Sequence, residues 1–351
     1  MKKSLIALAV LAASGAAMAQ SSVTLYGIAD IWFGSVKNEN NAASVAALSG
    51  AGSISQTLLN SGGVNGSRWG LKGSEDLGGG LKANFDYQAG ISLDTGAGTS
   101  ATATAFSRQS WVGFSGGFGA VRLGRTTTPF DDVSGSSDAI FDSALAPMNS
   151  VFKSVGYSAR QSNMIYYQAP SMGGFSGALS YGLGEDKTAT TGATSTTSMN
   201  LTYGAGPLAV QFAYQVEDII NPTAASSDKK FTRLGGSYDL GVAVAKLSYG
   251  KLNNVGNLTD ADATEYQIGV DYKASPALVL SASYARSSDN ATAGNAVRKG
   301  FGLGASYTLS KRTFLYGGFE SDTANGAVGV AKPGAGDSKH SVFAVGVQHR
   351  F

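Results

Sequence analysis

The feature that most constrains the fold is an alternation of apolar and polar residues with a period of two. It is clearest in the segment LKANFDYQA, where Leu81, Phe85 and Tyr87 occupy one parity and Lys82 and Asp86 the other. Successive side chains of a β-strand point to opposite faces, so this pattern predicts a strand with one apolar and one polar face. The same pattern recurs along most of the chain.

The recurring runs predict about 16 strands, an even number as expected for a single-chain outer-membrane barrel. Tight turns such as SEDLGGG, PSMGG and GAGP alternate with longer loops rich in Gly, Ser, Thr, Asn and Asp. Short turns on one side and long loops on the other are typical of such barrels. A soluble β-sandwich is the alternative, but it would show less uniform alternation.

No run of 18 apolar residues occurs after residue 19, so the sequence predicts no transmembrane helix. The hydrophobic residues are spread along the chain and are not gathered into helical stripes. The expected fold is therefore all-β, a 16-stranded antiparallel transmembrane β-barrel whose lipid-facing and lumen-facing residues alternate.

The first 19 residues have the pattern of a cleaved secretory signal peptide. Lys2 and Lys3 form a basic region, residues 5–13 are apolar, and Ala17-Met18-Ala19 fits the cleavage motif. The expected domain organisation is a signal peptide at residues 1–19 and a β-barrel domain at residues 20–351, exported to an outer membrane.

Composition excludes several classes of protein. The chain has no cysteine, which excludes a disulfide framework and thiolate metal ligands. Without Lys2 and Lys3, 24 basic residues face 24 acidic ones, and this balance argues against a nucleic-acid partner. We expect no cofactor.

The last run of alternating residues ends on an aromatic side chain. Phe343, Val345, Val347 and Phe351 share one face. A barrel must pair its last strand with its first, because an open sheet edge in lipid leaves unsatisfied backbone groups. Phe351 is therefore the expected C-terminal residue of the barrel closure.

One long segment interrupts the alternation. Residues 126–159 contain no strand or helix pattern, and loops of this length are usually functional or disordered. Apolar residues such as Phe130, Ile140 and Phe152 favour a folded loop over a disordered one. We expect this segment, the third long loop, to fold into the lumen and narrow it.

Six motifs follow in order along nearly the whole mature chain: SVTLYGIAD, SRWGLKGSEDLGGGLKANF, FSRQSWVGFSGGFGAVRLGR, ARQSNMIYYQAP, LSKRT and VGVQHRF. In these motifs the chain resembles the general (non-specific) porins of Gram-negative outer membranes, of the β-proteobacterial type found in Neisseria, Bordetella and Burkholderia. The resemblance implies a trimeric porin with an inward-folded third loop and wall arginines at Arg68, Arg108 and Arg160.

Parity alone places some of these arginines. Arg68, Arg122 and Arg160 fall on the lumen side, and Arg125 lies where the loop begins. The register of Arg108 is ambiguous, so its place rests on the resemblance.

The loop carries Asp131, Asp132 and Asp138, which we expect to face the wall arginines across water. Opposed charges in a narrow polar pore set ion selectivity. The alternative is that some pairs are ordinary salt bridges that attach the loop to the wall. The sequence leaves the sign of the selectivity open.

Catalysis and metal binding find little support in the sequence. His340, placed in the last loop, and His349, placed on the outer face of the last strand, have no serine and acid neighbours of the triad kind. Asp260, Asp262 and Glu265 could bind Ca²⁺, but a solvated loop is the simpler interpretation.

The predicted function is a non-enzymatic, water-filled channel for passive diffusion of ions and small hydrophilic solutes. Its expected partners are two further copies of the chain, outer-membrane lipid and the solutes in transit. A substrate-specific channel and a structural barrel without an open lumen are the alternatives.

Overall fold

The computed structural model describes residues 22–39, 53–100, 104–218, 228–290, 296–325 and 338–351. The expected signal peptide at 1–19 lies outside the described residues. No helix in this described part is long and apolar enough to cross a membrane.

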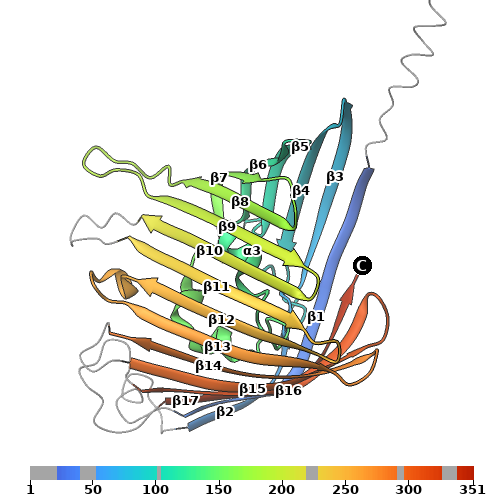
Figure 1. Ribbon diagram of the computed structural model, residues 1–351, viewed down its shortest axis with the longest axis vertical. Helices are drawn as coiled ribbons and strands as arrows, with labels where there is room; N and C mark the ends of the chain where they lie inside the picture. Colours follow the sequence, from blue (N-terminus) through green and yellow to red (C-terminus); the bar gives the residue numbers. More distant parts are fainter. Residues whose placement is uncertain (1–21, 40–52, 101–103, 219–227, 291–295, 326–337) are drawn as a thin grey trace, which may run out of the picture.

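The described residues form 17 strand segments and a few short helical turns (Figure 1). The strands are β1 Ser22–Glu39, β2 Ser53–Ser61, β3 Arg68–Gly78, β4 Leu81–Gly90, β5 Gln109–Gly116, β6 Gly119–Thr127, β7 Arg160–Gln168, β8 Phe175–Leu183, β9 Ser195–Ala205, β10 Leu208–Asp218, β11 Lys229–Asp239, β12 Ala243–Asn253, β13 Ala263–Lys273, β14 Leu278–Asp289, β15 Ala296–Thr308, β16 Thr313–Asn325 and β17 Ser338–Arg350. The helical elements are α3 Pro129–Ser134, α4 Pro147–Val151, η1 Lys153–Gly156 and η2 Val255–Asn257.

The strands close into one antiparallel barrel. From β3 onward each strand pairs with the next one in sequence, and β17 returns to pair with β1. β2 and β3 follow one another along the same edge of β1, where β2 pairs with residues 31–39 and β3 with residues 22–28. The two segments therefore occupy one position in the wall, and the barrel has the 16 strands that the sequence predicts.

The closure extends to the last residue. The N–H of Gly27 donates to the carbonyl of Phe351 at 3.0 Å, and the N–H of Phe351 donates to the carbonyl of Gly27 at 3.1 Å. Along β17, Phe343 and Val345 are exposed on the outer face, whereas Ala344 and Gln348 are buried. The parity expected for the last strand is thus confirmed.

The sequence did not predict β2, because its apolar residues do not keep one parity. Ile54 and Leu59 are both exposed although they stand five positions apart. A period-two pattern is hard to recognise when Leu58 and Leu59 are adjacent and so fall on different parities.

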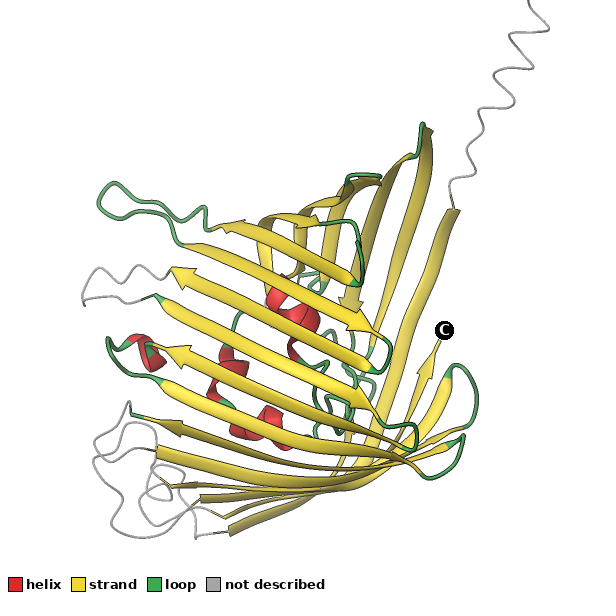
Figure 2. Cartoon of the chain, viewed as in Figure 1, coloured by secondary structure: helices red, strands yellow, loops and turns green. Residues whose placement is uncertain are grey.

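The segment 126–159 lies inside the curve of the barrel (Figure 2). It contains α3, α4 and η1, although the sequence predicted no helix there. The sequence signal for α3 is confined to its first residues. Thr128 caps α3 by accepting a hydrogen bond from the N–H of Asp131, and Pro129 begins the helix.

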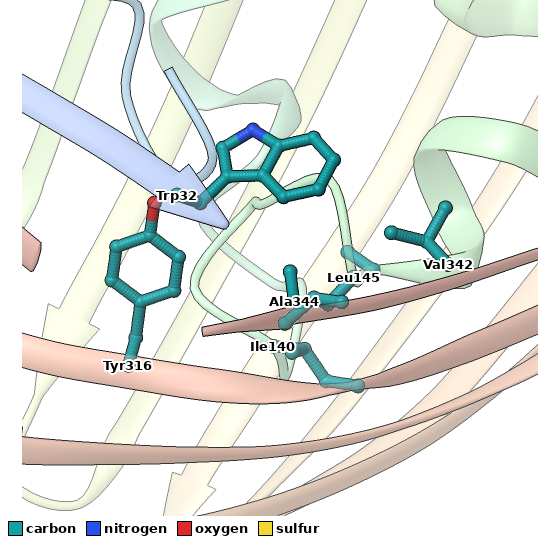
Figure 3. Close-up of a cluster of buried hydrophobic side chains, with 7 residues drawn as sticks. Trp32, Ile140, Leu145, Tyr316, Val342 and Ala344 are labelled. Carbon is teal, nitrogen blue, oxygen red and sulfur yellow. The ribbon is translucent and has the colours of Figure 1, made fainter. Parts of the chain in front are cut away.

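The apolar core of the protein lies between this segment and the lumen face of the wall. Ile140 and Leu145 of the segment pack with Trp32, Tyr316 and Val342 of the wall (Figure 3). Full burial of side chains of this size contributes about 1.5–3 kcal/mol each. Hydrophobic packing therefore holds the segment in the lumen.

Glycines on the wall make room for this packing. A Cβ at Gly302 would collide with the carbonyl oxygen of Leu145, and one at Gly269 would collide with Ala139. The segment can approach the strands so closely only because these two positions carry no side chain.

A buried carboxylate joins the barrel closure to the interruption between β2 and β3. Asp30 of β1 is fully buried and accepts five hydrogen bonds. The donors are the N–H groups of Gly63, Val64 and Asn65, the hydroxyl of Tyr316 and the amide of Gln348. One side chain thus ties together β1, the 62–67 turn, β16 and β17.

Replacing Asp30 with Ala should destabilise the barrel, because it leaves several buried donors without an acceptor. We expect the free energy of unfolding to fall by at least about 3 kcal/mol. Guanidinium unfolding in detergent, followed by tryptophan fluorescence, measures the change. The matched control is Asp94→Ala, because Asp94 is exposed. Equal stability of the two variants would contradict this role for Asp30.

Candidate functional site

The segment 126–159, which we call the constriction loop, is fixed at its start by β9. The N–H of Phe130 donates to the hydroxyl of Ser198 at 3.0 Å, and the amide of Asn200 donates to the carbonyl of Pro129 at 2.7 Å. These bonds set the position of α3. Asp131, in the first turn of α3, is thereby held at a defined place in the lumen.

Three buried glutamates of the wall hold the rest of the loop. Backbone or hydroxyl groups of the loop donate to them, so that loop donors are satisfied by charged acceptors. The pairs are the Ser158 N–H with Glu217, the Ser154 N–H with Glu265, and the Ser150 hydroxyl with Glu320.

A buried arginine completes the attachment. Arg233 of β11 is 1% exposed and donates to the carbonyl of Ser134 at 3.1 Å and to the hydroxyl of Ser154 at 2.6 Å. Its guanidinium also lies over the rings of Phe130 and Phe152. The sequence places Arg233 on the lumen side but gives no sign that it bridges two turns of the loop.

Charged side chains from wall and loop line one cavity of about 370 Å³. Arg68, Arg108, Arg160 and Arg233 come from the wall side, and Asp131 and Asp142 come from the loop. The structure therefore brings together the three arginines that the motifs indicate and one of the three predicted aspartates.

The arginines of this cavity are held by neutral partners. The Nε of Arg68 donates to the carbonyl of Gly66, and the Nε of Arg108 donates to the side-chain oxygen of Gln88, each at 2.8 Å. Within the described residues, neither guanidinium forms an ion pair, while Arg160 lies 4.0 Å from Asp131. The positive charge is thus only partly compensated.

The two loop carboxylates have higher pKa values than a free aspartate. Burial raises the pKa of Asp131, although Arg160 and the Tyr157 hydroxyl, which donates at 2.8 Å, oppose this effect. Asp142 is open to the cavity, yet the wall and loop around it exclude bulk water and raise its pKa as well. Both carboxylates therefore take up protons more readily than an exposed aspartate.

The other two predicted arginines lie outside this cavity. The guanidinium of Arg122 lies over the rings of Trp111 and Tyr166, with centroids at 5.2 and 4.6 Å. Arg125 donates to the carbonyl of Ser107 and to the hydroxyl of Ser162. Both belong to β6, on the same wall as Arg108.

Asp132 does not line this cavity either. Its carboxylate accepts hydrogen bonds from the hydroxyls of Thr127 and Tyr166, each at 2.7 Å. Asp132 therefore attaches α3 to β6 and β7. This is the role that the salt-bridge alternative gives to a loop aspartate, but here the partners are hydroxyl groups.

The structure corrects the expectation that Asp138 faces the wall arginines across water. It is 1% exposed and lies where the loop packs against β12, with Lys246 donating to its backbone carbonyl at 2.6 Å. Burial raises the pKa of Asp138 to about 7, and Asp142 adds to the effect. Packing of Ile140 and Leu145 into the wall turns this side chain away from the cavity.

The possible calcium ligands are not gathered into one site. Glu265 is buried against the loop, whereas Asp262 pairs with Lys251 at 3.4 Å and accepts from the amide of Asn253. The simpler interpretation of the acidic loop at 260–262 is therefore retained.

Comparison with known proteins identifies relatives along the whole chain. A family model described as Gram-negative porin matches residues 5–327. The chain is 35% identical over 375 residues to outer membrane porin protein 32 of Delftia acidovorans, with 100% of both chains covered. It is 32% identical over 395 residues to an outer membrane porin protein of Bordetella pertussis, again with 100% of both covered.

The fold has a matching solved structure. The anion-selective porin from Comamonas acidovorans superposes with a TM-score of 0.77 and is 29% identical, covering 95% of this chain and 100% of that chain. These matches confirm the resemblance that the motifs indicated. The chain belongs to the Gram-negative porin family.

Proposed function

We propose that the chain forms a water-filled channel in the outer membrane through which ions and small hydrophilic solutes diffuse passively. We further propose that the constriction loop and the wall arginines set its selectivity, with a preference for anions. The observation that carries the second proposal is the excess of guanidinium groups over carboxylates around one cavity.

The charges in this cavity favour anions for a physical reason. Arginine side chains are positively charged at neutral pH, whereas burial raises the pKa values of Asp131 and Asp142. The field of unpaired charges is poorly screened where low-dielectric walls surround a narrow aqueous space. An anion entering this space therefore meets a net positive potential. The related Comamonas porin is described as anion-selective, which agrees with this reasoning.

The remaining parts of the proposal concern export and assembly. Residues 1–19 would direct export and be removed, and the mature chain would assemble as a homotrimer, as its resemblance to general porins implies. N-terminal sequencing of the protein from outer membranes and gel migration without heating test these two points.

Conductance distinguishes a passive channel from the alternatives. In planar bilayers we expect steps whose current is linear in voltage and does not saturate with solute. A saturable block by one sugar or phosphate would favour a substrate-specific channel. An absence of steps at every protein concentration would favour a barrel without an open lumen.

Charge reversal at the wall arginines tests the selectivity. In Arg68→Glu and Arg160→Glu variants, the zero-current potential under a KCl gradient should shift toward cation preference, because a positive charge that lines the cavity becomes negative. Asp131→Asn should shift it in the opposite direction. The matched control is Asp138→Asn, which should leave the potential unchanged because Asp138 does not line the cavity. Unchanged potentials in both arginine variants would contradict the proposal.

The selectivity should also depend on pH. As the pH falls below neutral, Asp131 and Asp142 gain protons before exposed aspartates do, because burial raises their pKa values, while the arginines keep their charge. The anion preference should therefore rise as the pH falls. In an Asp131→Asn/Asp142→Asn double variant the rise should disappear, and in Asp138→Asn it should persist. A rise that survives in the double variant would assign the effect to other groups.

A further inference from the structure

A second cluster of charged side chains lies on the lumen face of the last two strands, away from the arginines. Among the described residues, Glu320, Asp322 and His340 form a group whose potential ligand atoms all lie within 4.8 Å of one another. Glu320 and Asp322 stand two positions apart on β16 and so share a face. His340 stands directly opposite Asp322 on β17, not in a loop as the sequence suggested.

The cluster contains a buried oxygen with no hydrogen-bond donor. Glu320 is 0% exposed, and its Oε1 accepts from the hydroxyl of Ser150 at 2.8 Å. Its Oε2 has no hydrogen-bond partner among the described residues and points to the Nδ1 of His340 at 3.4 Å. A buried, charged oxygen without a donor costs free energy unless a cation satisfies it.

The geometry fits a small divalent ion. His340 Nδ1 lies 3.1 Å from the Oδ2 of Asp322 and 3.4 Å from the Oε2 of Glu320. Ligands placed about 2.0–2.1 Å from Zn²⁺ at tetrahedral angles are about 3.3–3.4 Å from one another. The three atoms could therefore surround the ion with small side-chain movements.

The donor set also selects the kind of ion. One imidazole nitrogen and two carboxylate oxygens suit Zn²⁺ and similar transition-metal ions, whereas Ca²⁺ needs six to eight oxygens. His340 is 35% exposed, so the ion can enter from the lumen and leave its fourth position to water. To bind, the ion displaces any proton on Nδ1, which then leaves to solvent.

We propose that Glu320, Asp322 and His340 form a transition-metal site on the lumen wall, with Zn²⁺ as its representative ion. The site is linked to the constriction loop, because the same carboxylate of Glu320 binds the ion through Oε2 and holds Ser150 of α4 through Oε1. An occupied site places positive charge on the wall beside α4.

Zinc content of the purified chain tests the site directly. Untagged protein in detergent is stripped with EDTA, incubated with ZnCl₂, desalted and measured by mass spectrometry. We expect about one tightly held Zn²⁺ per chain. His340→Ala and Asp322→Asn should each lower this content at least tenfold, and excess Ca²⁺ should not displace the zinc.

The chain supplies its own control, because it has only two histidines and no cysteine. His349 is exposed on the opposite face of β17, so His349→Ala should bind as much zinc as the original chain. Heat-dependent gel migration shows that each variant is folded. If the original chain holds no more zinc than His340→Ala, or if His349→Ala loses as much, the proposal is wrong. In either case His340 would form only an ion pair with the two carboxylates.

A second measurement rests on the proposed channel function. Micromolar Zn²⁺ should shift the zero-current potential further toward anions in the original chain and not in His340→Ala. If zinc binds in detergent but this shift is absent, the proposed metal site stands, and the charge of the bound ion does not reach the ion path.

Discussion

The pairing of β1 with β17 is the constraint on which the rest of the structure depends. A sheet surrounded by lipid cannot leave an edge, because every unpaired backbone N–H and C=O there costs several kcal/mol. The pairing runs from Ile28 opposite Arg350 to Glu39 opposite Lys339, and Phe351 extends it to Gly27. Once the edge is closed, the alternation of side chains decides what faces lipid and what faces the lumen.

Closure of the sheet also produces a wide interior, into which the constriction loop folds. A 16-stranded barrel is too wide for wall side chains to fill, so its interior holds water or a folded segment. Here the wall provides apolar positions such as Trp32 and Tyr316, glycines for close approach, and buried glutamates for loop donors. The wall and the loop therefore form one packed unit, and the positions of Asp131 and Asp142 follow from that packing.

Much of this architecture could be predicted from the sequence, because period-two alternation is a direct consequence of strand geometry. The segment LKANFDYQA is an example, because all of it lies in β4, Leu81–Gly90. The motifs also indicated Arg68, Arg108 and Arg160, which line one cavity. Parity alone could not have placed Arg108, since it lies just before β5 and outside any strand.

The orientation of the loop aspartates could not be predicted in the same way. The loop has no period, so nothing in the sequence distinguishes Asp138, which is buried, from Asp142, which is open to the cavity. The difference arises from tertiary contacts and from a local turn in which Phe141 and Asp142 adopt φ values of 60° and 50°. Residues other than glycine rarely adopt such φ angles, and here the packing of Ile140 and Leu145 on either side stabilises this turn.

In this structure the constriction loop is packed against the wall, and we expect it to stay there while the channel conducts. The hydroxyls of Ser137, in the loop, and Ser248, in β12, are in hydrogen-bond contact, and both residues are fully buried. The chain has no cysteine, so Ser137→Cys/Ser248→Cys introduces one possible disulfide. Single-channel conductance of this variant, before and after oxidation, is the most direct measurement. We expect the disulfide to form and the conductance and zero-current potential to stay the same. Failure of the bond to form in the folded barrel, or a change in conductance when it forms, would show that the loop leaves the wall.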